Sequence, residues 1–218
     1  MNNKTELIFI LDRSGSMAGL ESDTVGGFNS LIERQRQQPG EVLVSTVLFS
    51  NFSSVIHDRV PLDQVPLLDE KTYQVGGCTA LLDAVGDAIH HIRNVHKYAR
   101  PEDVPDKTLF VITTDGMENA SHRYTNADIK AMIQKQQEDA GWEVLFMGAD
   151  IDAFAAARDI GIRSGNTVRY RRREDIRDSY DAVNIAVGHV RFDLDEKAML
   201  PVDWKADLEE KVRRAEEK

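Results

Sequence analysis

The sequence predicts an α/β protein built on a doubly wound, mostly parallel sheet, with one antiparallel edge strand and helices on both faces. Short runs of branched and aromatic residues alternate along the 218-residue chain with longer segments of helical periodicity. That order is typical of a parallel sheet covered by helices. Two expected strands are separated only by Ser50-Asn51-Phe52. Parallel neighbours need a crossover of a dozen or more residues, so this pair must be an antiparallel hairpin.

The first half of the chain supplies the hairpin and the strand beside it. The apolar run from Leu7 to Asp12 is short and shows no alternation, which predicts a strand buried on both faces. A helix is expected over 24–38, ended by Pro39-Gly40. Strands over 41–49 and 53–60 then form the hairpin.

The second half continues the alternation of strand and helix. A glycine-containing loop over 75–80 leads into a long helix whose apolar stripe runs from Leu81 to Val95. After a surface connection, a buried strand over 107–114 runs straight into Asp115. The remaining expected elements are a helix over 126–140 with a capping box of Thr125 and Asp128, a strand over 142–147, a helix over 152–160 closed by Gly161, a weaker strand over 166–170 and a helix over about 174–190.

We assign residues 1–190 to one α/β domain and residues 191–218 to a C-terminal extension. A terminal helix is expected over 203–218, because Trp204, Leu208 and Val212 follow one another at helical spacing. We expect this narrow apolar stripe to pack on the domain. Pairing between chains and binding to another protein remain alternatives.

Composition excludes some classes of partner. The net charge of −10 argues against a nucleic-acid surface or an anionic-membrane surface. Acids directly follow the only basic run, residues 171–173, which we interpret as a solvated helix start. Cys78 is the only cysteine, so no internal disulfide forms, and we see no apolar segment of signal or membrane-spanning length. We therefore expect a cytoplasmic protein.

Oxygen-bearing side chains gather where strands end. Asp12, Ser14 and Ser16 follow the first strand, and Asp115 ends the strand after the long helix. Thr79 lies in the glycine loop between them. If strand order reverses beside the first strand, these loops converge at the carboxyl edge of the sheet. Two carboxylates and three hydroxyls suit Mg²⁺, which prefers oxygen ligands and usually takes only one or two carboxylates.

The motifs Asp12-Arg13-Ser14-Gly15-Ser16, Thr79 behind two glycines, and Thr114-Asp115-Gly116 resemble the metal-ion-dependent adhesion site (MIDAS) of a von Willebrand factor A (vWA) domain. The resemblance covers about residues 5–190. It implies that Asp12, Ser14, Ser16 and Thr79 bind Mg²⁺, or Mn²⁺ or Ca²⁺, and that Asp115 binds directly or through water. It also implies that an Asp or Glu of a partner protein takes the open coordination position. The absence of a secretion signal and of disulfides resembles the stand-alone prokaryotic and phage-encoded members.

Enzymes are the main alternative class. A strand-terminal Asp12 with Mg²⁺ would suit a phosphatase, but those enzymes usually place a second acid two positions on, where this chain has Ser14. The Gly-x-Ser-x-Gly elbow of a serine hydrolase is absent. Cys78 is expected as a small buried neighbour of Thr79 and not as a nucleophile. A structural domain with a vacant site is a third alternative.

Other polar residues have simpler interpretations. Adjacent His90-His91 point in different directions on a helix, so they are expected on its polar face without a shared metal. Asp150 and Asp152 suit a helix cap better than a second cation site. Glu118-Asn119 are expected to shape the loop after Asp115.

Overall fold

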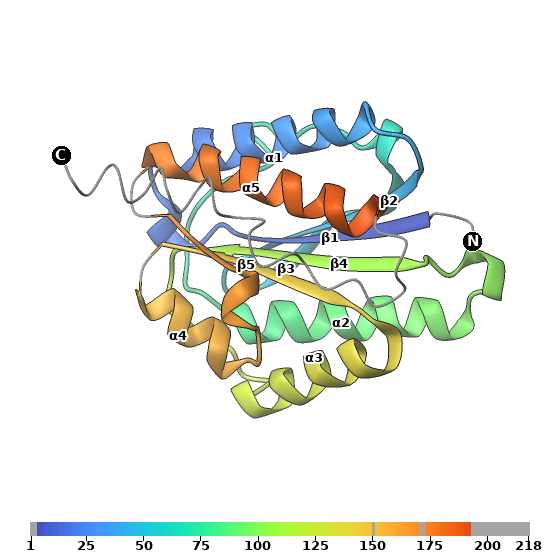
Figure 1. The fold of residues 1–218 in the computed structure, drawn as a ribbon. Helices are drawn as coiled ribbons and strands as arrows, with labels where there is room; N and C mark the ends of the chain where they lie inside the picture. Colours follow the sequence, from blue (N-terminus) through green and yellow to red (C-terminus); the bar gives the residue numbers. More distant parts are fainter. Residues whose placement is uncertain (1–3, 150, 171–172, 193–218) are drawn as a thin grey trace.

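A six-stranded sheet forms the centre of the computed structural model, which describes residues 4–149, 151–170 and 173–192 (Figure 1). The strand order is β3-β2-β1-β4-β5-β6. β1 pairs in parallel with both β2 and β4, whereas β2 and β3 form an antiparallel hairpin. The predicted doubly wound sheet with one antiparallel edge strand is confirmed. The strands are β1 (Lys4–Asp12), β2 (Glu41–Phe49), β3 (Ser53–Pro61), β4 (Lys107–Thr114), β5 (Glu143–Gly148) and β6 (Thr167–Arg169).

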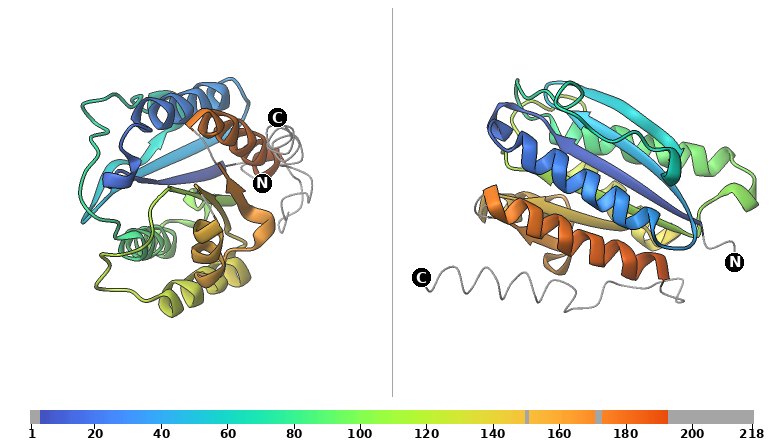
Figure 2. Two further views of the ribbon diagram at one scale, coloured as in Figure 1. Left: turned by 90° about the vertical axis from the view of Figure 1, so that its left-hand side faces the viewer. Right: turned by 90° about the horizontal axis from the view of Figure 1, so that it is seen from above.

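Helices cover both faces of the sheet. α1 and α5 lie together on one face, and α2, α3 and α4 lie on the other (Figures 1 and 2). None of the helices in the described part of the chain combines the length and the apolar character needed to cross a membrane. The helices are α1 (Glu21–Arg36), α2 (Leu81–Tyr98), α3 (Asn126–Ala140), α4 (Ile151–Asp159) and α5 (Arg173–Phe192).

Several helix boundaries differ from the prediction by one to three residues. α1 begins at Glu21, ahead of the expected start at residue 24, with Glu21 and Asp23 in its first turn. Acids there interact favourably with the positive end of the helix dipole, which an argument from apolar periodicity overlooks. α5 extends to Phe192, two residues beyond the expected end at about residue 190. The terminal helix expected over 203–218 lies outside the described residues.

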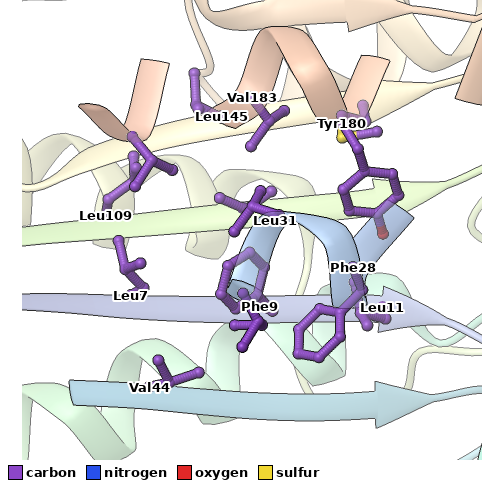
Figure 3. Close-up of a cluster of buried hydrophobic side chains, with 14 of the residues drawn as sticks. Leu7, Phe9, Leu11, Phe28, Leu31, Val44, Leu109, Leu145, Tyr180 and Val183 are labelled. Carbon is purple, nitrogen blue, oxygen red and sulfur yellow. The ribbon is translucent and has the colours of Figure 1, made fainter. Parts of the chain in front are cut away.

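β1 is buried on both sides because its side chains alternate between two cores. Leu7, Phe9 and Leu11 pack towards α1 and α5, as Figure 3 shows. Ile8 and Ile10 belong to the second core, which α2 and α3 cover. None of these five side chains is exposed to solvent. The unbroken apolar run is therefore explained by burial on both faces.

A glycine sets the distance between α1 and α5. A Cβ atom added at Gly27 would lie 2.2 Å from Cδ2 of the buried Tyr180 ring. At neighbouring Gly26 the nearest atom would be 3.9 Å away. Two residues of the same helix thus differ sharply in the space available to a side chain.

We expect Gly27→Ala to destabilise the protein by about 1–3 kcal/mol, because the fully packed ring of Tyr180 must shift. Gly26→Ala is the matched control and should stabilise by about 0.5–1 kcal/mol, since alanine is the better helix former. Urea unfolding followed by circular dichroism measures both changes. Equal effects of the two substitutions would contradict the close contact.

His57 is a buried histidine on β3. Its Nδ1 lies 2.9 Å from Oγ1 of Thr46, and its ring stacks on Phe28. Burial lowers the pKa of His57 below the ordinary value of 6.5. The folded chain therefore binds fewer protons at this site than the unfolded chain does, and stability rises with pH through this range.

We accordingly expect the free energy of unfolding to fall as the pH is lowered through 6.5, and to fall less steeply in His57→Gln. The control is His90→Gln, which changes an exposed histidine and should keep the wild-type dependence. Urea titrations at several pH values give the slopes. A slope unaltered by His57→Gln would show that this histidine does not contribute to the pH dependence.

Candidate metal centre

The loops that carry the two acids are neighbours in space. β4 lies beside β1, with Thr113 paired to Leu11 one residue before the end of each strand. Asp12 ends β1, and Asp115 directly follows β4, so both lie at the same carboxyl edge. The predicted reversal of strand order beside the first strand is confirmed.

Hydrogen bonds hold the third loop against the other two. Gly15 N donates to the carbonyl of Gly77 at 2.9 Å. Thr79 N donates to Oδ1 of Asn119 at 2.9 Å, and Asn119 N donates back to the carbonyl of Thr79 at 3.0 Å. Gly77 has a φ of 85°, a conformation that glycine adopts without strain. The loops after β1, before α2 and after β4 are thereby fixed relative to one another.

Asp12 is fully buried, and both its carboxylate oxygens accept hydrogen bonds. Oδ1 accepts from Ser14 N at 2.6 Å, and Oδ2 accepts from Oγ1 of Thr114 at 2.6 Å. Its backbone carbonyl accepts from the Tyr73 hydroxyl. Burial raises the pKa of Asp12, the bonds from Thr114 and Ser14 oppose this shift, and the charge of Asp115 adds to it. No lysine or arginine of the described segments forms an ion pair with Asp12.

Side-chain oxygens from separate loops surround one small space beside Gly116. An added Cβ there would lie 2.8 Å from Ser16 Oγ, 2.8 Å from Thr79 Oγ1 and 3.5 Å from Asp12 Oδ2. Ser14 Oγ lies 2.9 Å from Ser16 Oγ. Neither serine oxygen caps a helix. A carboxylate and neutral hydroxyls around a space that glycine leaves open fit the requirements of a hard divalent cation.

The site is partly open to solvent. Ser14 and Thr79 are buried, Asp115 is half-buried, and Ser16 is exposed. Within the described ranges, His, Cys, Asp and Glu form no group of three or more that could hold a metal. The oxygens around Gly116 come instead from two hydroxyls and the Asp12 carboxylate, a set that suits a hard cation better than metals that prefer nitrogen or sulfur ligands.

The structure corrects one expectation and adds two residues. Cys78 is exposed, so the prediction of a buried neighbour of Thr79 is wrong. In this loop Thr79 is buried, while Cys78 N bonds to Oδ1 of Asn51 and its side chain is left in solvent. Sequence reasoning did not identify Thr114 and Tyr73 as hydrogen-bond donors to Asp12. The position of Thr114 directly before Asp115 could have indicated that it lies at the site, whereas nothing in the sequence around Tyr73 indicates its bond to Asp12.

Glu118 and the histidines His90-His91 have the structural roles predicted for them. Glu118 accepts from the backbone N–H groups of Leu82, Ala120 and Ser121, so it holds the loop to the start of α2. His90-His91 are exposed. Asp150 and the side chain of Asp152 lie outside the described residues, as do Arg171-Arg172.

Comparison with known proteins gives matches to solved structures alone. No family model and no curated protein matches the sequence. A von Willebrand factor type A protein from Catenulispora acidiphila superposes with a TM-score of 0.57 at 12% identity, over 84% of this chain and 42% of that one. The ArnB paralog VWA2 of Sulfolobus acidocaldarius gives 0.54 at 16% identity, over 81% and 44%. The chain has the fold of a vWA domain.

A further similar structure is proximal thread matrix protein 1 of the mussel byssus, described with a zinc-occupied MIDAS motif. It has a TM-score of 0.56 and 12% identity, and the match covers 83% of this chain and 44% of that one. At 12% sequence identity, this similarity shows that the two chains share a fold. The present chain spans less than half the length of each of these solved chains.

We expect Gly116→Ala to abolish cation binding, because its methyl group would occupy the space between Ser16 Oγ and Thr79 Oγ1. Gly165→Ala is the matched control, since a Cβ there meets nothing within 4 Å. Isothermal titration with MnCl₂ measures binding, and circular dichroism verifies the fold. Wild-type affinity in Gly116→Ala would contradict the placement of the site.

Proposed function

We propose that this chain is a protein-interaction module that binds Mg²⁺, or Mn²⁺ or Ca²⁺, at a MIDAS and recognises an acidic residue of a partner protein through it. The observation that carries the proposal is the convergence of Asp12, Ser16 and Thr79 oxygens on the space beside Gly116. The buried Asp12 carboxylate supports it too, because a buried charge without an ionic partner is costly and a cation would offset that cost.

Each residue has a distinct part in this proposal. Asp12 would supply negative charge, and Ser14, Ser16 and Thr79 would supply neutral oxygens. Asp115 would hold the ion directly or through water. Neutral ligands leave much of the charge of the ion uncompensated, so the bound ion would supply a Lewis-acidic position for a carboxylate. The exposed Ser16 marks the side from which a partner has access.

The residue two positions after Asp12 supports a binding role over the alternative of a Mg²⁺-dependent phosphatase. The hydrogen bonds that Asp12 accepts leave a lone pair on each carboxylate oxygen, which a cation can use. A phosphatase of this kind uses its strand-terminal Asp as a nucleophile together with a second acid. Ser14 stands where such phosphatases usually have a second acid.

We extend the proposal to the setting in which the module works. A single cysteine and the absence of a possible internal disulfide fit a reducing compartment, so we propose a cytoplasmic protein of the stand-alone prokaryotic or phage type. The net charge of −10 supports a protein partner over nucleic acid.

Titration calorimetry with MgCl₂ and MnCl₂ tests the metal site. We expect Asp12→Ala to remove binding, and Ser14→Ala/Ser16→Ala to weaken it by more than the roughly 10–100-fold that loss of an outer-shell partner costs. The matched control is Ser53→Ala/Ser54→Ala, which changes two exposed serines of β3. Circular dichroism establishes that each variant is folded.

Two results would count against the proposal. Unaltered affinity in folded Asp12→Ala would refute the metal assignment. Mg²⁺-dependent hydrolysis of p-nitrophenyl phosphate by wild type, lost in Asp12→Asn, would establish the phosphatase alternative instead.

A further inference from the structure

Two large apolar side chains are exposed at the edge of the sheet that carries the candidate metal centre. Phe52 is 84% exposed and Met117 is 67% exposed. Together with Tyr98, they are the most exposed large apolar side chains of the described residues. Phe52 is also unusual for its position, because it follows Ser50-Asn51 in a hairpin turn where polar residues and glycine are preferred.

The two side chains belong to loops on opposite sides of the Asp12 loop. Phe52 lies in the turn between β2 and β3, and Met117 follows β4. β2 and β4 are the two neighbours of β1, so the strand ends that lead to Phe52 and Met117 are about 10 Å apart with Asp12 between them. The metal centre therefore lies between the two loops that carry these side chains.

The turn that carries Phe52 is held by the hydrogen bonds that also order the metal loops. Ser50 N donates to the carbonyl of Phe52 at 3.2 Å. Oδ1 of Asn51 accepts from Cys78 N at 3.0 Å, and the carbonyl of Ser50 accepts from Ala80 N at 2.9 Å. The turn is thus fixed on both sides of Thr79.

The loop that carries Met117 is fixed in the same way. Gly116 N donates to Oγ1 of Thr114 at 3.1 Å, the same hydroxyl that bonds Asp12. On its other side, Glu118 bonds the backbone N–H of Leu82 at 2.9 Å. The backbone at both residues is therefore held in place relative to the metal loops, which favours preorganised contact with a partner.

Charged residues are few on the loops that carry the two apolar side chains. The segments 50–54, 76–80 and 116–117 contain no charged residue, whereas the Asp12 loop contains Arg13 and the loop after β4 contains Asp115 and Glu118. A cation bound at the site would add a positive charge beside these mostly uncharged segments. Charge complementarity then calls for one acidic side chain set among apolar residues, and additional acids would be repelled by a protein of net charge −10.

We propose that Phe52 and Met117 are partner-contact residues, and that the recognised protein segment carries a single Asp or Glu flanked closely on both sides by apolar side chains. This inference rests on the proposed function, because it takes the acid to be bound at the metal. The apolar contacts supply affinity and select among the many exposed acids that other proteins present.

A phage-displayed library of short peptides, with Asp or Glu fixed at the centre and flanks randomised, tests the inference. The library is selected in MgCl₂ and eluted with chelator. The proteins compared are the wild type, Phe52→Ser/Met117→Ser, and the control Tyr98→Ser. Tyr98 is 78% exposed but ends α2 at the opposite edge of the sheet. Calorimetry with MnCl₂ verifies that the double variant keeps its metal site, since neither residue supplies a ligand.

We expect wild type and Tyr98→Ser to enrich peptides with apolar residues next to the acid. The double variant should lose this preference and bind the best wild-type peptide about tenfold or more weakly, with unaltered Mn²⁺ affinity. Metal-dependent selection of the acid with no apolar preference in wild type would overturn the inference while leaving the proposed function standing. Apolar preference retained by the double variant would also overturn it. Absence of any Mg²⁺-dependent selection by wild type would overturn both.

Discussion

The parallel pairing of β1 with β4 is the constraint on which the candidate site depends. It joins two segments that are distant in the sequence and brings their carboxyl ends to one edge of the sheet. β2 pairs on the other side of β1, so the hairpin turn lies at the same edge. The positions of the candidate ligand loops and of the loops that carry Phe52 and Met117 therefore both follow from the strand order. The helices on each face position the site indirectly, by burying the apolar side chains that keep β1 central.

The position of Asp12 gives that edge its chemical character. A fully buried carboxylate is expensive unless hydrogen bonds or a cation compensate its charge. The chain supplies one backbone N–H and one hydroxyl to the two carboxylate oxygens, and burial still raises the pKa of Asp12. An apolar side chain at this position would cost less free energy to bury. Binding of a cation by the carboxylate would offset this cost, as the proposed function requires.

Much of this architecture could be predicted because it follows from local rules. The apolar runs ending in Asp12 and Asp115 predicted two buried strands, and the three-residue connection at Ser50–Phe52 predicted the hairpin. Two misses concern tertiary context. The direction of the Cys78 side chain depends on bonds from a loop distant in the sequence. The bond from Tyr73 to Asp12 joins positions that no spacing rule connects. The start of α1 is a local miss, because its first turn contains Glu21 and Asp23 and lies ahead of the apolar stripe on which the prediction was based.

The separation of the ligand loops along the chain has a consequence for stability. Ser16, Thr79 and the segment at Gly116 meet only after β1, β4 and α2 have assembled. Bringing together residues so distant in sequence costs loop-closure entropy, and the unfolded chain offers no assembled site. A cation held at this edge would therefore bind the folded chain and not the unfolded chain, and by mass action it would raise the free energy of unfolding. If the site assembles after the transition state for folding, this gain would slow unfolding and lengthen the lifetime of the folded domain.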